Sequence, residues 1–101
     1  MKIDFNASVK RIDGQPLIET NQQGEAVQAT FKVVVVNAVL APSKNDDGVM
    51  KVRKYQLAHR VYDASEAMEI SLDEAKLIKD CITATYGPLI VGQVDALLEG
   101  K

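Results

Sequence analysis

The sequence predicts an α+β fold in which an N-terminal β-hairpin packs on three to four helices and the chain ends in a helical hairpin. Three observations lead to this fold class. Apolar and polar residues alternate near the start of the chain, which is the period of a half-buried strand. Ser71–Glu74 has the pattern of a helix start, and Tyr86-Gly87-Pro88 has the pattern of one helix ending where another begins. The 101 residues are enough for one small domain, which we expect to span 1–101.

The hairpin is expected within residues 2–20. Three apolar side chains alternate with polar ones along its first strand, namely Ile3, Phe5 and Ala7. Asp13-Gly14 is a tight-turn dipeptide, and residues 16–20 can return as the partner strand. Residues 21–24 are polar and predict a further turn. Because an isolated hairpin is only marginally stable in water, we expect this one to pack against the rest of the chain.

Four consecutive valines make residues 31–41 a segment in which helix and strand compete. In a helix each β-branched valine costs about 0.5 kcal/mol relative to alanine, so four cost about 2 kcal/mol. Burial of a single valine returns about 1.5 kcal/mol, so packing can override that cost. Thr30 suits the N-cap of a helix, and Pro42 suits the position just past its end. We predict a helix over residues 30–41, with a central strand as the alternative.

The middle of the chain predicts a loop, a second helix and a short link. Residues 42–48 are the most turn-rich stretch and predict a solvated loop. Between residues 50 and 62 apolar side chains recur at helical spacing, and they predict a buried face at Val52, Tyr55, Ala58, Val61 and Tyr62. Residues 68–70 fit either an extended link or an edge strand.

The last third of the chain predicts two helices. Ser71 is expected to cap the first, with Glu74 reaching back to its amide in a capping box. The apolar face of this helix is predicted at Ala75, Ile78, Ile82 and Thr85, with Leu77 and Cys81 beside it. Gly87 is expected to end this helix in a left-handed conformation, and Pro88 is expected to begin the next one.

The second of these helices is predicted to present Ile90, Val94, Leu97 and Leu98 as its apolar face. Gly92 inside a helix costs about 1 kcal/mol relative to alanine, which predicts the close approach of a neighbouring backbone. Leu97-Leu98-Glu99-Gly100 predicts the end of the helix at Gly100. Because a chain of this length has a thin core, we also expect a homo-oligomer.

Bulk composition narrows the class of protein. Twelve basic and fourteen acidic residues give a net charge of −2, whereas a general nucleic-acid binder is more often basic, so we expect protein partners and no nucleic acid. The start of the chain lacks the apolar region of a signal peptide, and the longest apolar run is too short to span a bilayer. We therefore expect a cytoplasmic protein with no membrane partner. A single cysteine excludes an internal disulfide.

The sequence contains no motif for catalysis or metal binding. His59 is the only histidine and Cys81 the only cysteine, and neither lies in a nucleophile motif. One histidine and one cysteine do not suffice for a zinc site. Asp46-Asp47-Gly48 lacks the alternating ligands of a calcium loop. We expect no enzyme activity and no catalytic residue, cofactor, metal or small-molecule substrate.

One cluster of charge remains as a candidate interaction face. It comprises Lys51, Arg53, Lys54 and Arg60, with His59 among them, all within the predicted second helix. Cations on one face of a helix can bind an acidic partner or nucleic acid. The alternative is a solvated face that is balanced by acidic residues in the flanking segments. The absence of tryptophan argues against binding single strands by stacking.

Both ends of the chain resemble a family of small bacteriophage and prophage proteins. The N-terminal part of the resemblance is Met1-Lys2-Ile3-Asp4-Phe5-Asn6 followed by Asp13-Gly14. The C-terminal part is Ala75-Lys76-Leu77-Ile78-Lys79, then residues 86–93 and Leu97-Leu98-Glu99-Gly100. The four valines depart from the less β-branched helix expected in that family. Because these motifs are structural, the resemblance implies a phage setting and no particular activity.

The lack of chemical motifs and the resemblance together favour a non-enzymatic phage-type protein. We expect it to act through protein–protein contacts in virion assembly or structure, with the hairpin or the 42–49 loop as the contact element. One alternative is a cytoplasmic regulator or inhibitor of a host protein. Another is a nucleic-acid-binding accessory protein that uses the basic face. The expected location is the host cell cytoplasm or the virion.

Overall fold

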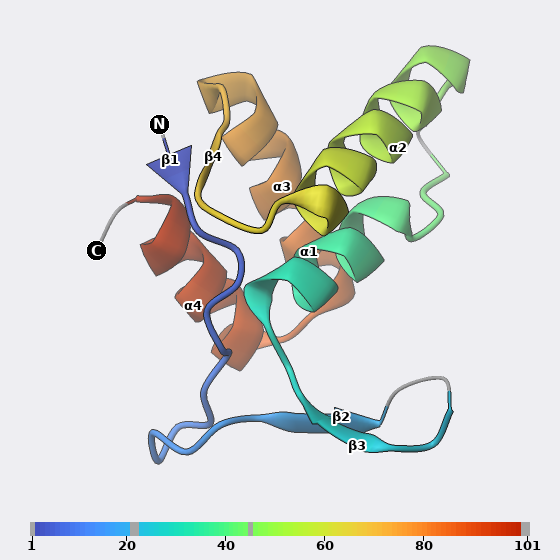
Figure 1. Ribbon diagram of the computed structural model, residues 1–101. Helices are drawn as coiled ribbons and strands as arrows, with labels where there is room; N and C mark the ends of the chain where they lie inside the picture. The colour runs from blue at the N-terminus through green and yellow to red at the C-terminus, as the bar shows by residue number, and fades with distance from the viewer. Residues whose placement is uncertain (1, 21–22, 45, 100–101) are drawn as a thin grey trace.

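Four helices and two small antiparallel sheets form the fold of the computed structural model, which describes residues 2–20, 23–44 and 46–99 (Figure 1). The helices are α1 (Phe31–Leu40), α2 (Gly48–Asp63), α3 (Leu72–Thr85) and α4 (Pro88–Leu98). The strands are β1 (Lys2–Ile3), β2 (Ile18–Thr20), β3 (Ala26–Gln28) and β4 (Met68–Glu69). The predicted α+β class, with an N-terminal hairpin and a C-terminal helical pair, is confirmed. None of the described helices is long and apolar enough to cross a membrane.

The predicted turn of the N-terminal hairpin is present. Gly14 has a φ of +86°, a conformation that favours glycine, and Lys10 forms an antiparallel bridge with Pro16 across the turn. Beyond this turn β2 pairs with β3, which the sequence did not predict. The turn expected over residues 21–24 lies partly outside the described residues, and Gly24 has a φ of +81°.

The first strand has a different partner from the predicted one. Residues 16–20 were expected to pair with it, but β1 pairs with β4, through Ile3 and Met68. Ile3 and Phe5 are buried, so this segment lies against the helices, whereas Ala7 is exposed. Of the two alternatives for residues 68–70, the edge strand is therefore the one that forms.

α1 confirms the helix prediction for the valine segment. The Thr30 hydroxyl accepts a hydrogen bond from the Val33 amide at 3.3 Å, and the helix ends two residues before Pro42. Val34 and Val35 are completely buried, whereas Val33 is exposed. Burial of two valines thus outweighs the helix-propensity cost of the run.

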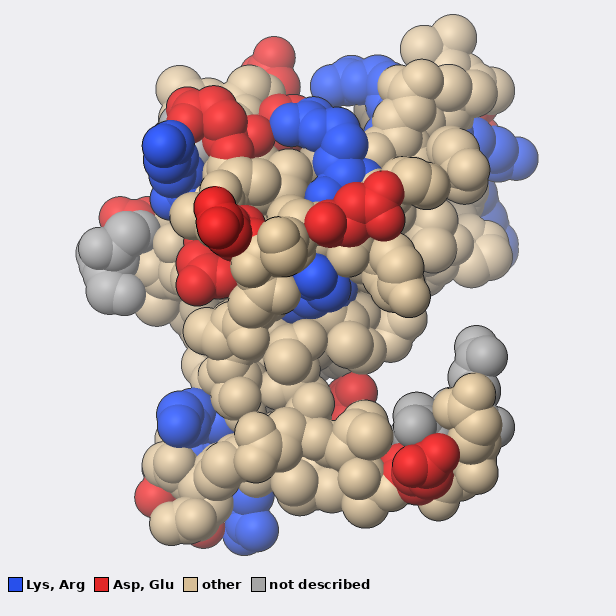
Figure 2. All heavy atoms as spheres, in the orientation of Figure 1, with Lys and Arg blue, Asp and Glu red and all other residues tan. Residues whose placement is uncertain are grey.

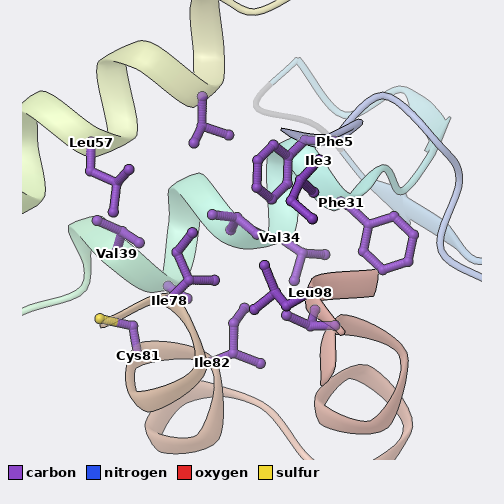
Figure 3. Close-up of a cluster of buried hydrophobic side chains, with 14 of the residues drawn as sticks. Ile3, Phe5, Phe31, Val34, Val39, Leu57, Ile78, Cys81, Ile82 and Leu98 are labelled. Atoms are coloured by element: carbon purple, nitrogen blue, oxygen red, sulfur yellow. The ribbon is translucent and has the colours of Figure 1, made fainter. Parts of the chain in front are cut away.

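One core joins the four helices and the N-terminal segment. Figure 3 shows side chains converging from the N-terminal segment, α1, α3 and α4, among them Phe5, Val34, Ile78, Ile82 and Leu98. The largest fully buried side chains are Phe5, Ile70, Ile78, Ile82, Val9, Val34, Val35, Val39, Val61 and Val94. Each contributes about 1.5–3 kcal/mol, so this core stabilises the fold far more than the two short sheets do. Thr85, predicted on the apolar face of α3, is exposed.

α2 buries a different face from the predicted one. Its buried residues are Lys54, Leu57, Ala58 and Val61, whereas the predicted Val52, Tyr55 and Tyr62 are exposed. The prediction failed because it counted lysine as a surface residue. The aliphatic stem of Lys54 occupies a core-facing position while its charge is paired.

The capping box at the start of α3 forms as predicted. The Ser71 hydroxyl accepts from the Glu74 amide at 3.1 Å, and the Glu74 carboxylate accepts from the Ser71 amide at 2.9 Å. α3 and α4 are further joined by Lys79, whose ammonium lies 3.0 Å from Asp95 and 3.2 Å from Glu99. Charge pairs between the two helices therefore add to their shared apolar contact.

Two glycines of this helical pair differ from prediction. Gly87 has a φ of −88° and is the N-cap of α4, so α3 ends at Thr85, with Tyr86 as its C-cap and without a left-handed residue. Gly92 is exposed, and a Cβ added there would meet no described atom within 4 Å, so no backbone packs closely against it. Pro88 begins α4 as predicted. The expected helix end at Gly100 lies outside the described residues.

Candidate functional site

The four predicted interaction residues all lie on α2, but they do not form one basic face. Side chains two residues apart point about 200° apart around a helix, so Lys51 and Arg53 lie on opposite sides of α2. Lys54 is directed into the protein, and Arg60 is paired with α3. On the face shown in Figure 2, basic and acidic side chains are both scattered over the helical body. This dispersal weakens the nucleic-acid alternative, since binding phosphates requires gathered cations.

Lys54 forms a buried ion pair that the sequence did not reveal. Its Nζ donates to Asp46 Oδ2 at 2.6 Å, and the two side chains are only 11% and 12% exposed. The hydrogen bond to Asp46 raises the pKa of Lys54 above its ordinary value, although burial acts in the opposite direction. The lysine is therefore charged at neutral pH, and its charge holds the loop before α2 against the helix. It is not available to a partner.

Arg60 is also engaged within the protein. Its guanidinium forms an ion pair with the Glu74 carboxylate and donates to the Glu69 carbonyl oxygen at 3.0 Å. Burial raises the pKa of Glu74, but hydrogen bonds from the Ser71 amide and from Arg60 outweigh it and leave that pKa below its ordinary value. Arg60 thus joins α2 to β4 and to the start of α3.

Neither His59 nor Cys81 is placed for catalysis. His59 is exposed on α2, and its Nδ1 lies 2.9 Å from Asp63. Cys81 is a buried thiol on α3, and burial raises its pKa, which disfavours the nucleophilic thiolate. Among the described residues, no group of three or more His, Cys, Asp or Glu side chains is arranged to hold a metal ion.

The β2–β3 pair projects from the fold, and we call it the arm. Figure 1 shows the arm at the end of the molecule opposite α2, and in Figure 2 it stands off from the helical body. Within the described chain each strand of the arm has one strand neighbour, so the outer edge of each has no strand partner. All three residues of β3 are exposed. A two-stranded ribbon this short is marginal alone and gains stability from a surface or strand that covers it.

The base of the arm is fixed to the body by backbone hydrogen bonds and by the side chain of Gln93. Three hydrogen bonds close a ring: Val9 N to Ala29 O at 2.8 Å, Leu17 N to Val9 O at 2.9 Å, and Ala29 N to Leu17 O at 2.8 Å. The Gln93 side chain of α4 donates to the Lys10 carbonyl oxygen at 2.7 Å and accepts from the Lys10 amide at 2.8 Å. These bonds set the direction in which the arm leaves the helices.

An open groove of about 720 Å³ lies between the hairpin turn, the arm and the start of α4. Its walls are Ile12, Pro16, Leu17, Ile18, Pro88 and Leu89, with Arg11 at the side. Ile12 is 94% exposed and Ile18 is 55% exposed. Arg11 lies 3.3 Å from Asp13, so part of its charge is balanced. The groove thus presents apolar surface of the kind that proteins bury against other proteins.

Sequence reasoning missed both the arm and the groove. Residues 25–29 contain one large apolar side chain, Val27, which is too weak a pattern to predict a strand. The groove brings the hairpin turn together with Pro88, and no local pattern encodes that contact. The one signal was Ile12, a lone apolar residue beside a predicted turn.

The arm and the groove can bind apolar side chains and an added strand, and the groove walls carry no group suited to acid–base chemistry. In comparisons with known proteins, no family model, no curated protein and no solved structure matches this chain.

Proposed function

We propose that this chain is a non-enzymatic bacteriophage-type protein that acts through protein–protein contacts in virion assembly or structure, with the arm and the groove as its contact element. The observation that carries the proposal is the exposed apolar surface of Ile12 and Ile18 beside a two-stranded arm. The phage setting rests on the resemblance at the two ends of the sequence. We place the protein in the host cytoplasm while particles assemble and in the virion afterwards.

The occupant proposed for this surface is an extended strand of another virion subunit. A strand edge accepts an incoming strand through main-chain hydrogen bonds, and pockets beside it select the side chains of that strand. Ile18 belongs both to β2 and to the groove, so edge and pocket adjoin. Because the base of the arm is already fixed, binding would order little of this chain and lose little entropy.

The 42–49 loop is less suited to be the contact element. Its Asp46 carboxylate is held by Lys54, and Asp47 Oδ1 accepts from the Met50 amide at 2.8 Å as the N-cap of α2. Both acidic side chains of the loop are therefore used inside the protein. The arm has no comparable internal use for Ile18.

The test is photo-crosslinking during phage production. A photo-reactive amino acid is placed at Ile12 or at Ile18, and the matched control carries it at Thr83, which is exposed on α3. We expect crosslinks from positions 12 and 18 to one virion protein and none from position 83. Crosslinks to the chain itself would identify a homo-oligomer as the assembled form.

Two outcomes would count against the proposal. Crosslinks only to a host protein, with the chain absent from purified virions by mass spectrometry, would replace it with the host-regulator alternative. Crosslinks from Thr83 alone, or from none of the three positions, would show that the arm and the groove are not the contact element.

A further inference from the structure

α2 has a second apolar side, on a different surface from the arm and the groove. It consists of Val49, Val52, Tyr55, His59 and Tyr62, which we call the outer face. The spacing of three or four residues places these side chains along one side of the helix, and all five are exposed. Figure 1 shows α2 at the margin of the molecule, with the other helices to one side of it. A helix that buries one face and exposes apolar residues on the opposite one has an unused contact surface.

A hollow of about 360 Å³ adjoins the outer face. It lies between the end of α1, the following loop and α2. Leu40, Pro42 and Tyr55 form apolar parts of its walls, and Lys51 and the Asp46–Lys54 ion pair form polar parts. Leu40 is an exposed leucine at the end of α1. Because Tyr55 borders the hollow and also belongs to the outer face, the two form one continuous surface. The hollow provides a place for one side chain of a partner, against Leu40 and Tyr55.

Cations border this surface on both sides. Lys51 and Arg53 are exposed, and their positions two residues apart place them on opposite sides of the outer face. Neither makes an ion pair with another described residue. The single acidic residue within α2 is Asp63, which is held by His59. The surface is therefore a largely apolar strip with one cation on each flank, and the exposed His59–Asp63 contact lies at its C-terminal end.

We propose that the outer face and its hollow bind an amphipathic helix of a protein partner, with apolar side chains along one side and Glu or Asp on both flanks. Charge complementarity selects this occupant. This inference goes beyond the proposed function and does not depend on it, since it concerns another surface and another kind of partner.

Two other occupants fit the charges less well. Parallel pairing of α2 with α2 of a second copy would bring Lys51 and Arg53 of both copies together. In antiparallel pairing Lys51 would face the end of the helix that carries Arg60, where the acidic Asp63 is already engaged by His59. A nucleic acid would find two exposed cations around an apolar centre, on a protein of net charge −2. The two tyrosines, 61% and 66% exposed, supply roughly 250 Å² of this surface. With the exposed parts of Val49, Val52 and Leu40 added, the surface is still smaller than the about 800 Å² per partner of a typical stable complex. We therefore expect binding in the micromolar range or weaker.

The test uses two designed helical peptides of the same length as α2, 16 residues. Both carry leucine along one side, and the flanks are glutamate in one peptide and lysine in the other. NMR spectra of the isotope-labelled chain at low salt should show the glutamate peptide shifting amides of α2 and of Leu40, and the lysine peptide leaving them unchanged. Tyr55→Ala should weaken the glutamate peptide by about tenfold or more, as expected for a central aromatic contact.

Charge reversal provides the sharper comparison. Lys51→Glu with Arg53→Glu should weaken the glutamate peptide by about tenfold or more and create binding of the lysine peptide. The matched control, Lys10→Glu with Lys76→Glu, makes the same change in net charge at two exposed lysines elsewhere and should leave affinity within about twofold. All these positions are exposed, so retained amide dispersion will show that each variant is folded.

Several results would overturn the inference. One is equal affinity for the two peptides, or no binding of the glutamate peptide at millimolar concentration. Another is a duplex DNA that shifts the same amides. A dimer in sedimentation equilibrium that Tyr55→Ala dissociates would assign the outer face to a second copy instead.

Discussion

Removing the Asp46 carboxylate should destabilise this protein more than any other single change at an acidic residue. Asp46 Oδ2 lies 2.6 Å from Lys54 Nζ, and about nine-tenths of each side chain is buried. At an effective dielectric constant of 20 the attraction is about 6 kcal/mol, and desolvation of the two charges offsets most of it. The net value of the intact pair is therefore small. Asp46→Ala, however, leaves the ammonium of Lys54 buried without its partner, which costs about 3 kcal/mol.

Urea unfolding followed by circular dichroism measures this loss, with an unchanged slope confirming two-state behaviour. For a domain of this length, 3 kcal/mol corresponds to a fall in Tm of about 15 °C. Lys54→Met in the Asp46→Ala background should restore most of the stability, because no unpaired charge remains. Asp47→Ala is the neighbouring control and should cost about 1 kcal/mol, the value of an N-cap. A loss below about 1 kcal/mol for Asp46→Ala, or a double variant no more stable than Asp46→Ala, would refute the reasoning.

Three further predictions concern the helical pair. Gly92→Ala should raise the free energy of unfolding by about 1 kcal/mol, because alanine has the higher helix propensity and the added Cβ meets no described atom within 4 Å. A lower Tm for this variant would indicate that a neighbouring backbone does pack closely against Gly92. Glu74→Gln should cost about 1 kcal/mol at pH 7. Burial raises the pKa of Glu74, yet the Ser71 amide and Arg60 hold it below its ordinary value near 4.5. The stability that the Glu74 carboxylate contributes is therefore present above pH 4.5, and it is lost as the pH falls through the folded-state pKa. The free energies of unfolding of the unaltered protein and of Glu74→Gln, measured by urea titration from pH 3 to 7, should therefore converge at the acidic end. A difference between them that does not change with pH would contradict the role assigned to the Glu74 carboxylate. Burial raises the pKa of the Cys81 thiol and shields it from reagents. Iodoacetamide at pH 8 should therefore alkylate Cys81 more than about tenfold faster in urea than in the native protein. Equal rates would show that the thiol is accessible in the native protein.

Helix starts could be predicted from the sequence because their chemistry is local. Thr30, the Ser71–Glu74 box and Pro88 each act within one turn of the chain, and α1, α3 and α4 begin where these residues indicate. The helix over the valine run was predicted correctly because burial energy exceeds propensity cost. Alternation near Phe5 also identified a segment with a buried side, although its strand partner was wrong.

Contacts between distant segments could not be predicted in this way. Lys54 counts as polar in any search for the spacing of apolar residues. Only the folded loop brings Asp46 close enough to neutralise its charge, so the buried face of α2 was predicted wrongly. The pairing of Arg60, one of the four candidate interaction residues, with Glu74 on another helix could not be predicted for the same reason. Gly92 has an open environment that composition cannot report.

The central claim is that Ile12 and Ile18 contact another virion protein. The most direct measurement is the yield of infectious particles from phage carrying Ile12→Asp with Ile18→Asp, compared with phage carrying Thr83→Asp. All three side chains are exposed, so the purified variants should keep a Tm within a few degrees of the unaltered protein. We predict that particle yield falls by more than about tenfold for the double variant alone, because a charge at a central apolar contact removes the binding. A folded double variant that supports a normal yield of particles would contradict the claim.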